Sequence, residues 1–74
     1  MNKEIQVNDI HLASFLMAKD FRLRRIEGER RKTFIFVDVP PEKITEFYSD
    51  QDTVSARRLL DALRNLKGFI AQSI

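Results

Sequence analysis

The sequence predicts a small single α+β domain over residues 1–74, with elements in the order (β)-α-β-β-α-α and an antiparallel hairpin packed against helices. Three observations support this class. Apolar and basic residues alternate on either side of a glycine between Phe21 and Val39, which is typical of a hairpin. Apolar residues recur at helical spacing over 10–18 and again over 53–70. A chain of 74 residues with 43% hydrophobic content suffices for one core and is too short for two.

The beginning of the chain predicts an edge strand followed by a buried helix. Residues 4–7 alternate polar and apolar side chains, as a short strand does. Asn8 or Asp9 can accept the free N–H groups of a first helical turn. The helix over 10–18 is apolar around most of its circumference, so we expect it to be the central core helix. Its solvent-facing stripe is expected to consist of His11, Ser14 and Ala18.

The hairpin is the element that the sequence predicts most clearly. Its first strand runs from Phe21 to Ile26, and Glu27-Gly28-Glu29 supplies the turn. Gly28 suits this turn because glycine adopts positive φ without steric cost. The return strand, Arg31 to Val39, is rich in β-branched and aromatic residues.

Two further helices are predicted after the hairpin. Pro41 favours the first position of a short helix over 41–48. Asp52 or Thr53 is expected to cap the last helix, over 53–70. The apolar side of that helix consists of Ala56, Leu59, Leu63, Leu66 and Ile70, with Leu60 at its flank. We expect this helix and the helix over 10–18 to cover one face of the hairpin.

The usual chemical sites lack their residues. No cysteine is present, which excludes disulfides and thiolate zinc sites, and a single histidine does not make an imidazole site. Gly28 and Gly68 are isolated, so no phosphate-binding glycine loop exists. A calcium loop starting at Asp50 would need glycine at its sixth position and glutamate at its twelfth, and these positions hold Ser55 and Asp61. We therefore expect no catalytic, metal-binding or cofactor-binding residue, no cofactor and no enzymatic activity.

Charge is segregated along the chain. Residues 19–32 hold seven basic and three acidic residues, giving +4, whereas residues 33–52 hold one basic and five acidic residues, giving −4. The candidate contacts for nucleic acid or another anion are Arg22, Arg24, Arg25, Arg30, Arg31 and Lys32. Guanidinium groups in a row can bind phosphates. Basic residues also keep an exposed hairpin soluble, and we prefer this interpretation.

The polar side of the last helix carries a smaller basic set. It consists of Arg57, Arg58 and Arg64, with Asp61 among them. Asp61 lies four residues after Arg57 and three before Arg64, which is the spacing of ion pairs within a helix. We therefore expect a solvated face held by such pairs.

The strand Thr33–Val37 is apolar on both faces, with Phe34 and Phe36 on one side and Ile35 and Val37 on the other. A hairpin under one helical layer is expected to have a polar outer face. Either the three helices wrap both faces, or the strand meets a second copy of the chain. The four apolar residues are therefore a candidate self-association surface in a homodimer.

Two segments carry a resemblance to a known family. They are Asp9–Leu16, followed by Phe21 and Phe34-Ile35-Phe36, and Val54–Lys67. Together they resemble a family of short bacterial and phage-associated proteins known only as a domain of unknown function (DUF5659). The resemblance spans nearly the whole chain and implies no activity, cofactor or site. It adds a phage or mobile-element context.

The N-terminal residues alternate charged and apolar side chains, unlike the unbroken apolar core of a signal peptide. No window approaches the roughly 18 continuous apolar residues of a membrane span. We expect a cytoplasmic protein that makes no membrane contact.

The leading functional hypothesis is a non-enzymatic interaction module that self-associates and binds a protein partner. It rests on the missing chemistry and on the apolar strand faces. The alternative is a nucleic-acid-binding accessory protein that uses the basic hairpin. This alternative depends on phosphate contacts, because the apolar strand offers no polar side chains for reading base edges.

Overall fold

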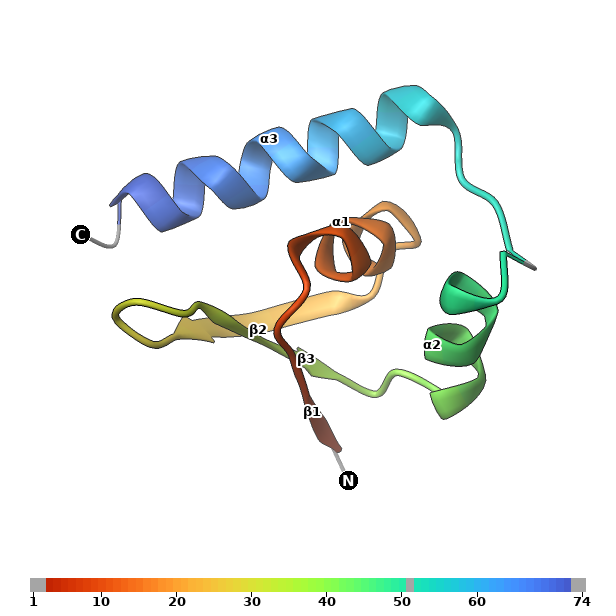
Figure 1. Ribbon diagram of the computed structural model, residues 1–74, viewed down its shortest axis with the longest axis horizontal. Coiled ribbons are helices and arrows are strands. Elements are labelled where there is room, and N and C mark those ends of the chain that lie inside the picture. The colour runs from red at the N-terminus through yellow and green to blue at the C-terminus, as the bar shows by residue number, and fades with distance from the viewer. Residues whose placement is uncertain (1–2, 51, 73–74) are drawn as a thin grey trace.

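A computed structural model describes residues 3–50 and 52–72, and these residues form one antiparallel sheet and three helices (Figure 1). The elements in chain order are β1 (Glu4–Val7), α1 (Ile10–Ala18), β2 (Arg22–Glu27), β3 (Thr33–Val37), α2 (Pro41–Tyr48) and α3 (Ala56–Gln72). The predicted α+β class and element order are confirmed. Within the described ranges, no helix combines the length and apolarity that crossing a bilayer requires.

The sheet has the strand order β1-β3-β2, so β3 is the central strand. Its Ile35 lies between Gln6 of β1 and Arg25 of β2, and both neighbours run antiparallel to it. The predicted edge strand over 4–7 is therefore confirmed. Because β1 and β2 use both hydrogen-bonding edges of β3, no edge of β3 is left for a second chain.

The hairpin is confirmed, with a shorter return strand and a longer loop than predicted. The return strand was predicted over 31–39, and β3 occupies only 33–37 because the loop of residues 28–32 precedes it and Asp38 turns away at a φ of 58°. Gly28 has a φ of 99°. A Cβ at this position would lie 2.1 Å from the Arg31 carbonyl oxygen, so the loop requires glycine.

The domain has three layers, with α1 between the sheet and α3 (Figure 1). Asp9 caps α1, since its Oδ1 accepts the N–H of His11 at 2.8 Å. The prediction of a solvent stripe on α1 is wrong for Ser14 and Ala18, which are 1% and 4% exposed. The reason is that α3 stacks on this side of α1, and not beside α1 on the hairpin as predicted. Only His11 of the predicted stripe is exposed.

The core lies mainly between the sheet and α1, and α2 closes one end of it. The largest side chains that are completely buried include Phe34, Phe36, Leu16 and Leu66. The helix α2 matches its predicted bounds and packs through Phe47, whose ring centroid lies 5.1 Å from that of Phe15.

The helix α3 begins three residues later than predicted. Its cap is Ser55, whose Oγ accepts the N–H of Arg58 at 3.2 Å, and not Asp52 or Thr53. The Asp52 carboxylate is engaged elsewhere, because Lys19 Nζ and Lys43 Nζ lie 2.9 and 3.1 Å from it.

Candidate interaction surfaces

A β-bulge determines which side chains of β2 point outward. The register shifts between Leu23, which faces Phe36, and Arg25, which faces Ile35. Leu23 and Ile26 on either side of the bulge both pack against the core. The two residues between them, Arg24 and Arg25, therefore both lie on the outer face of the sheet.

These two arginines reach across the central strand to β1. Arg25 donates through Nη1 and Nη2 to the two Glu4 carboxylate oxygens, at 3.1 and 3.2 Å, and also pairs with Glu27. Arg24 Nε lies 3.3 Å from Glu4 Oε2. Because Glu4 and Arg25 belong to the strands on either side of β3, their pair bridges β3. Ile35, on the outer face of β3 between Gln6 and Arg25, is only 1% exposed.

Two of the three arginines on the outer face of the sheet are therefore paired with glutamates of the same sheet. The hydrogen bond from Arg25 lowers the pKa of Glu4 below its ordinary value, and the hydrogen bonds to Glu4 and Glu27 raise the pKa of Arg25. Both groups thus stay ionised through the physiological range. The pairs are partly exposed, so each contributes little stability as a salt bridge. Their side chains also cover the apolar residues of β3.

The four residues predicted as a self-association surface are buried within one chain. Phe34, Ile35, Phe36 and Val37 are each 7% exposed or less. Phe34 and Phe36 belong to the core beneath α1. On the other face of the strand, Ile35 lies between Gln6 of β1 and Arg25 of β2, and it is buried within the single chain. These four side chains are thus not presented at the surface of the chain, and self-association itself stays a prediction.

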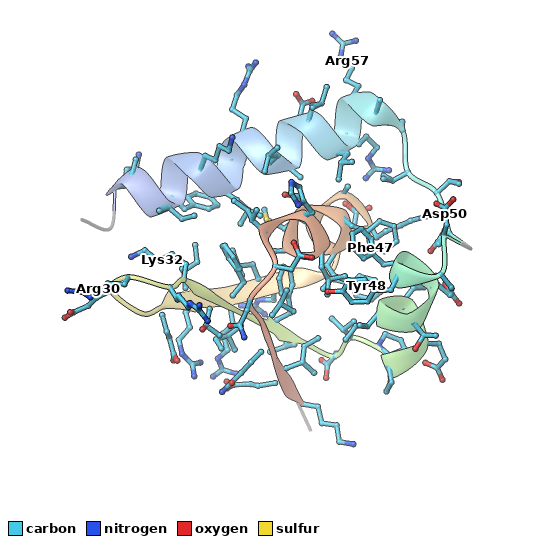
Figure 2. All side chains as sticks on the ribbon, viewed as in Figure 1. Arg30, Lys32, Phe47, Tyr48, Asp50 and Arg57 are labelled. Atoms are coloured by element: carbon cyan, nitrogen blue, oxygen red, sulfur yellow. The ribbon has the colours of Figure 1, made fainter. Side chains whose placement is uncertain are left out.

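The predicted basic hairpin is divided into two parts. Arg30 and Arg31 lie exposed in the loop and have no ion pair within residues 3–50 and 52–72, and Figure 2 shows Arg30 at the tip, pointing away from the domain. Lys32 Nζ donates to the Gly28 carbonyl oxygen at 2.9 Å. Arg22 is exposed on the sheet, beside the two paired arginines described above. A contact with nucleic acid stays a prediction.

A surface that the sequence did not predict lies on α3. The side of α3 that meets α1 is centred on Ala62 and Leu66, which are buried. Leu60 projects to another side and is 63% exposed, and Leu63 is half-buried. A shallow hollow on this side is lined by Leu60, Leu63, Arg64 and Lys67. We call these four residues the outer face of α3. The available signal was the flanking position of Leu60, which widens the apolar side beyond what one neighbouring helix can cover.

The basic residues on and next to this outer face have no carboxylate partner among residues 3–50 and 52–72. Arg57, Arg64 and Lys67 form no ion pair in the described part of the chain. The predicted pairs of Asp61 with Arg57 and Arg64 are therefore absent, because Asp61 borders a groove next to Met17 of α1. Figure 2 shows Arg57 projecting away from α1 and the sheet. By contrast, Arg58 binds both oxygens of Asp20 at 3.1 Å.

One further charge cluster joins three parts of the chain. Asp52 binds Lys19 at the end of α1 and Lys43 of α2, and Lys43 also pairs with Glu46. The hydrogen bond from Lys19, followed by that from Lys43, lowers the pKa of Asp52 to about 2. Every member has a partner in the chain, so the cluster is a structural clamp. Among residues 3–50 and 52–72, no three metal-ligating side chains come together.

Comparison with known proteins gives one match. No curated protein and no solved structure matches the chain. The sequence model of a family described as a domain of unknown function (DUF5659) matches residues 2–72. This match confirms the resemblance seen in the sequence, while the bacterial or phage origin stays a prediction. The chain therefore belongs to the DUF5659 family of domains of unknown function.

Proposed function

We propose that this chain is a non-enzymatic, cytoplasmic interaction module that binds a protein partner, and that its contact surface is the outer face of α3. The observation that carries the proposal is Leu60, a large apolar side chain that is 63% exposed. It lies beside Leu63 in a hollow bordered by Arg64 and Lys67. Apolar side chains grouped at the surface within a polar rim are typical of protein contact sites.

The rest of the surface offers less to a protein partner. The apolar residues on the outer face of the sheet are covered, and Glu4 and Glu27 balance two of its arginines. Tyr48 is also exposed, but its hydroxyl donates to Asp9 at 3.4 Å and its ring packs edge-on against Phe47. The outer face of α3 combines exposed apolar area with charges that have no ion pair in the described part of the chain, which favours it as the contact surface.

Site-specific photo-cross-linking in cells that naturally produce the chain tests this proposal. A photoreactive amino acid replaces Leu60 in one variant and Phe69 in the control. Phe69 is 47% exposed and lies nine residues further along, on the opposite side of α3. We expect a discrete protein adduct from position 60 and none of that size from position 69. An adduct with another copy of the chain would support the hypothesis that the module self-associates. No adduct, or the same adducts from both positions, would contradict the proposal.

Nucleic-acid binding is the second candidate, and the exposed loop arginines favour it. Arg30 and Arg31 have no ion pair in the described residues, so phosphate groups could be their partners. A mobility-shift titration at low and moderate salt tests this candidate. The double variant Arg30→Glu with Arg31→Glu should abolish any retarded band, whereas Arg24→Glu on the sheet should not. Absence of retardation by the unmodified chain at low salt would exclude this function.

A further inference from the structure

The helix α3 has residues at helix-packing spacing on two sides. One side packs on α1 and carries Leu59, Ala62 and Leu66. The open side is the outer face of α3, whose members lie at positions i, i+3, i+4 and i+7. This spacing is the one through which a helix packs against another helix. It extends over about two turns, or roughly 10 Å. A helix of two to three turns is therefore long enough to pack along the open side of α3, as α1 packs along the other side.

The charge of this surface determines the chemistry of its occupant. Arg57, Arg64 and Lys67 are all cationic and lack carboxylate partners in the described residues, and Asp61 faces the α1 side. An occupant with carboxylates beside its apolar stripe would pair with these cations. The α3 helix of a second copy would instead bring cations against cations, which is unfavourable. Charge complementarity thus favours an acidic segment over the α3 helix of a second copy.

We infer that the outer face of α3 binds an acidic amphipathic helix of another protein, an inference that rests on the proposed function. The apolar stripe of this helix lies in the hollow between Leu60 and Leu63. Its Asp and Glu side chains, which flank the stripe, pair with Arg64 and Lys67. A helix bound in this way contacts its groove through apolar residues at positions i, i+3 or i+4, and i+7.

A synthetic peptide of about 18 residues provides the test, since this length spans five helical turns. The probe is fluorescein-labelled and has leucines along one side and glutamates elsewhere. One control peptide has the same composition with its leucines dispersed around the helix, and another has lysine in place of every glutamate. We measure fluorescence anisotropy with the whole chain. We expect binding of the acidic amphipathic peptide alone, and weaker binding as salt is raised.

Variants of the chain assign this binding to α3. Leu60→Glu should weaken binding of the acidic peptide by about tenfold or more, because it removes an apolar anchor and adds a repelling charge. Arg64→Glu with Lys67→Glu should lose the acidic peptide and gain the lysine peptide. The matched controls are Phe69→Ala, on the opposite side of α3, and Arg22→Glu, on the sheet, and both should bind as the unmodified chain does. Circular dichroism checks that each variant is folded. If Leu60→Glu unfolds, Leu60→Ala replaces it, and we expect Leu60→Ala to weaken binding several-fold.

The outcomes separate this inference from the proposed function. Failure of the acidic peptide to bind, together with a specific cross-link at position 60, overturns the acidic helix and leaves the interaction module standing. Failure of both experiments overturns both. Equal binding of the acidic and lysine peptides, or binding that Leu60→Glu and the double charge reversal leave unchanged, also overturns the inference. The exchange of acidic for lysine peptide in the double variant supports it.

Discussion

The outer face of the sheet and the outer face of α3 both carry basic residues beside apolar ones, but they differ in how these are partnered. On the sheet, Arg24 and Arg25 pair with glutamates, and Ile35 lies beneath them. On α3, Arg64 and Lys67 have no partner in the described residues, and Leu60 is uncovered. The two surfaces therefore differ in whether the chain itself supplies the partners of these cations.

The difference follows from the geometry of the two elements. Neighbouring strands lie about 4.8 Å apart, so a long arginine on β2 can reach a glutamate on β1 across the single central strand. A cation on the side of a helix that faces away from the rest of the domain has partners within reach only three or four residues away on the same helix. Asp61 has this spacing to Arg57 and Arg64 but borders the α1 side of the helix. Charge pairing thus engages Arg24 and Arg25 on the sheet, whereas Arg64 and Lys67 of α3 have no ion pair in the described residues.

The largest expected effect is the difference in the free energy of unfolding between Ile35→Ala and Leu60→Ala. Ile35 is 1% exposed, so its truncation leaves a cavity and should lower the free energy of unfolding by about 2–4 kcal/mol. Leu60→Ala should lower it by less than about 0.5 kcal/mol, because Leu60 is mostly in solvent in the single chain. Urea denaturation measures both. Equal losses would show that the charged side chains do not exclude water from Ile35.

Acid should weaken the Asp52 clamp, which is built from paired charges like those of the sheet. The pKa of Asp52 is lowered to about 2 from 3.8, so the contribution of its ion pairs is present above about pH 4. It is lost as the pH falls through 2. Thermal unfolding between pH 6 and pH 2 should show a steeper loss of stability in the unmodified chain than in Asp52→Asn. Asp50→Asn, which alters a carboxylate with no ion pair in the described residues, should retain the steep loss.

Removing Glu4 should leave the outer face of the sheet with unpaired cations, as on α3. The variant Glu4→Ala leaves Arg24 without its partner and Arg25 with Glu27 alone, so the sheet gains cations available to polyanions. We expect later elution from a heparin column in a salt gradient, with a small loss of thermal stability. Glu42→Ala makes the same change in net charge on α2. If both variants elute together, the effect comes from net charge and not from release of the arginines.

The smallest effect on stability should come from the unpaired charges of α3. Arg64→Glu with Lys67→Glu breaks no ion pair in the described residues, so the free energy of unfolding should change by less than about 0.5 kcal/mol. Denaturation in urea checks this value. A larger loss would mean that these cations already stabilise the single chain, which would remove the contrast with the sheet.

Local sequence signals predicted a large part of the fold. The bounds of α1 and α2 follow from Asp9 as a cap and from Pro41 at a first helical position, and both signals act within a few residues. Gly28 likewise marked the hairpin because the loop allows no Cβ there. The strand β1 was visible from its alternation alone.

The errors concern features that depend on distant parts of the chain. Ser14 and Ala18 were expected in solvent because nothing near them in sequence covers them, and their cover is α3. Ile35 was expected to need a helix or a second copy, because the bulge that directs Arg25 over it is defined only by pairing with β3. The exposure of Leu60 was missed since the helical wheel does not show which part of a wide apolar side meets α1.

The burial of α1 between two layers has a consequence for how the chain folds. A helix of nine residues is marginal in water, and this one is apolar on nearly every side. It needs the sheet beneath it and α3 above it, and its contact with α3 joins segments that β2, β3 and α2 separate in the sequence. A folding species without α3 would leave α1 half uncovered. We therefore expect a single all-or-none transition, whose rate is governed by the closure of this long-range contact.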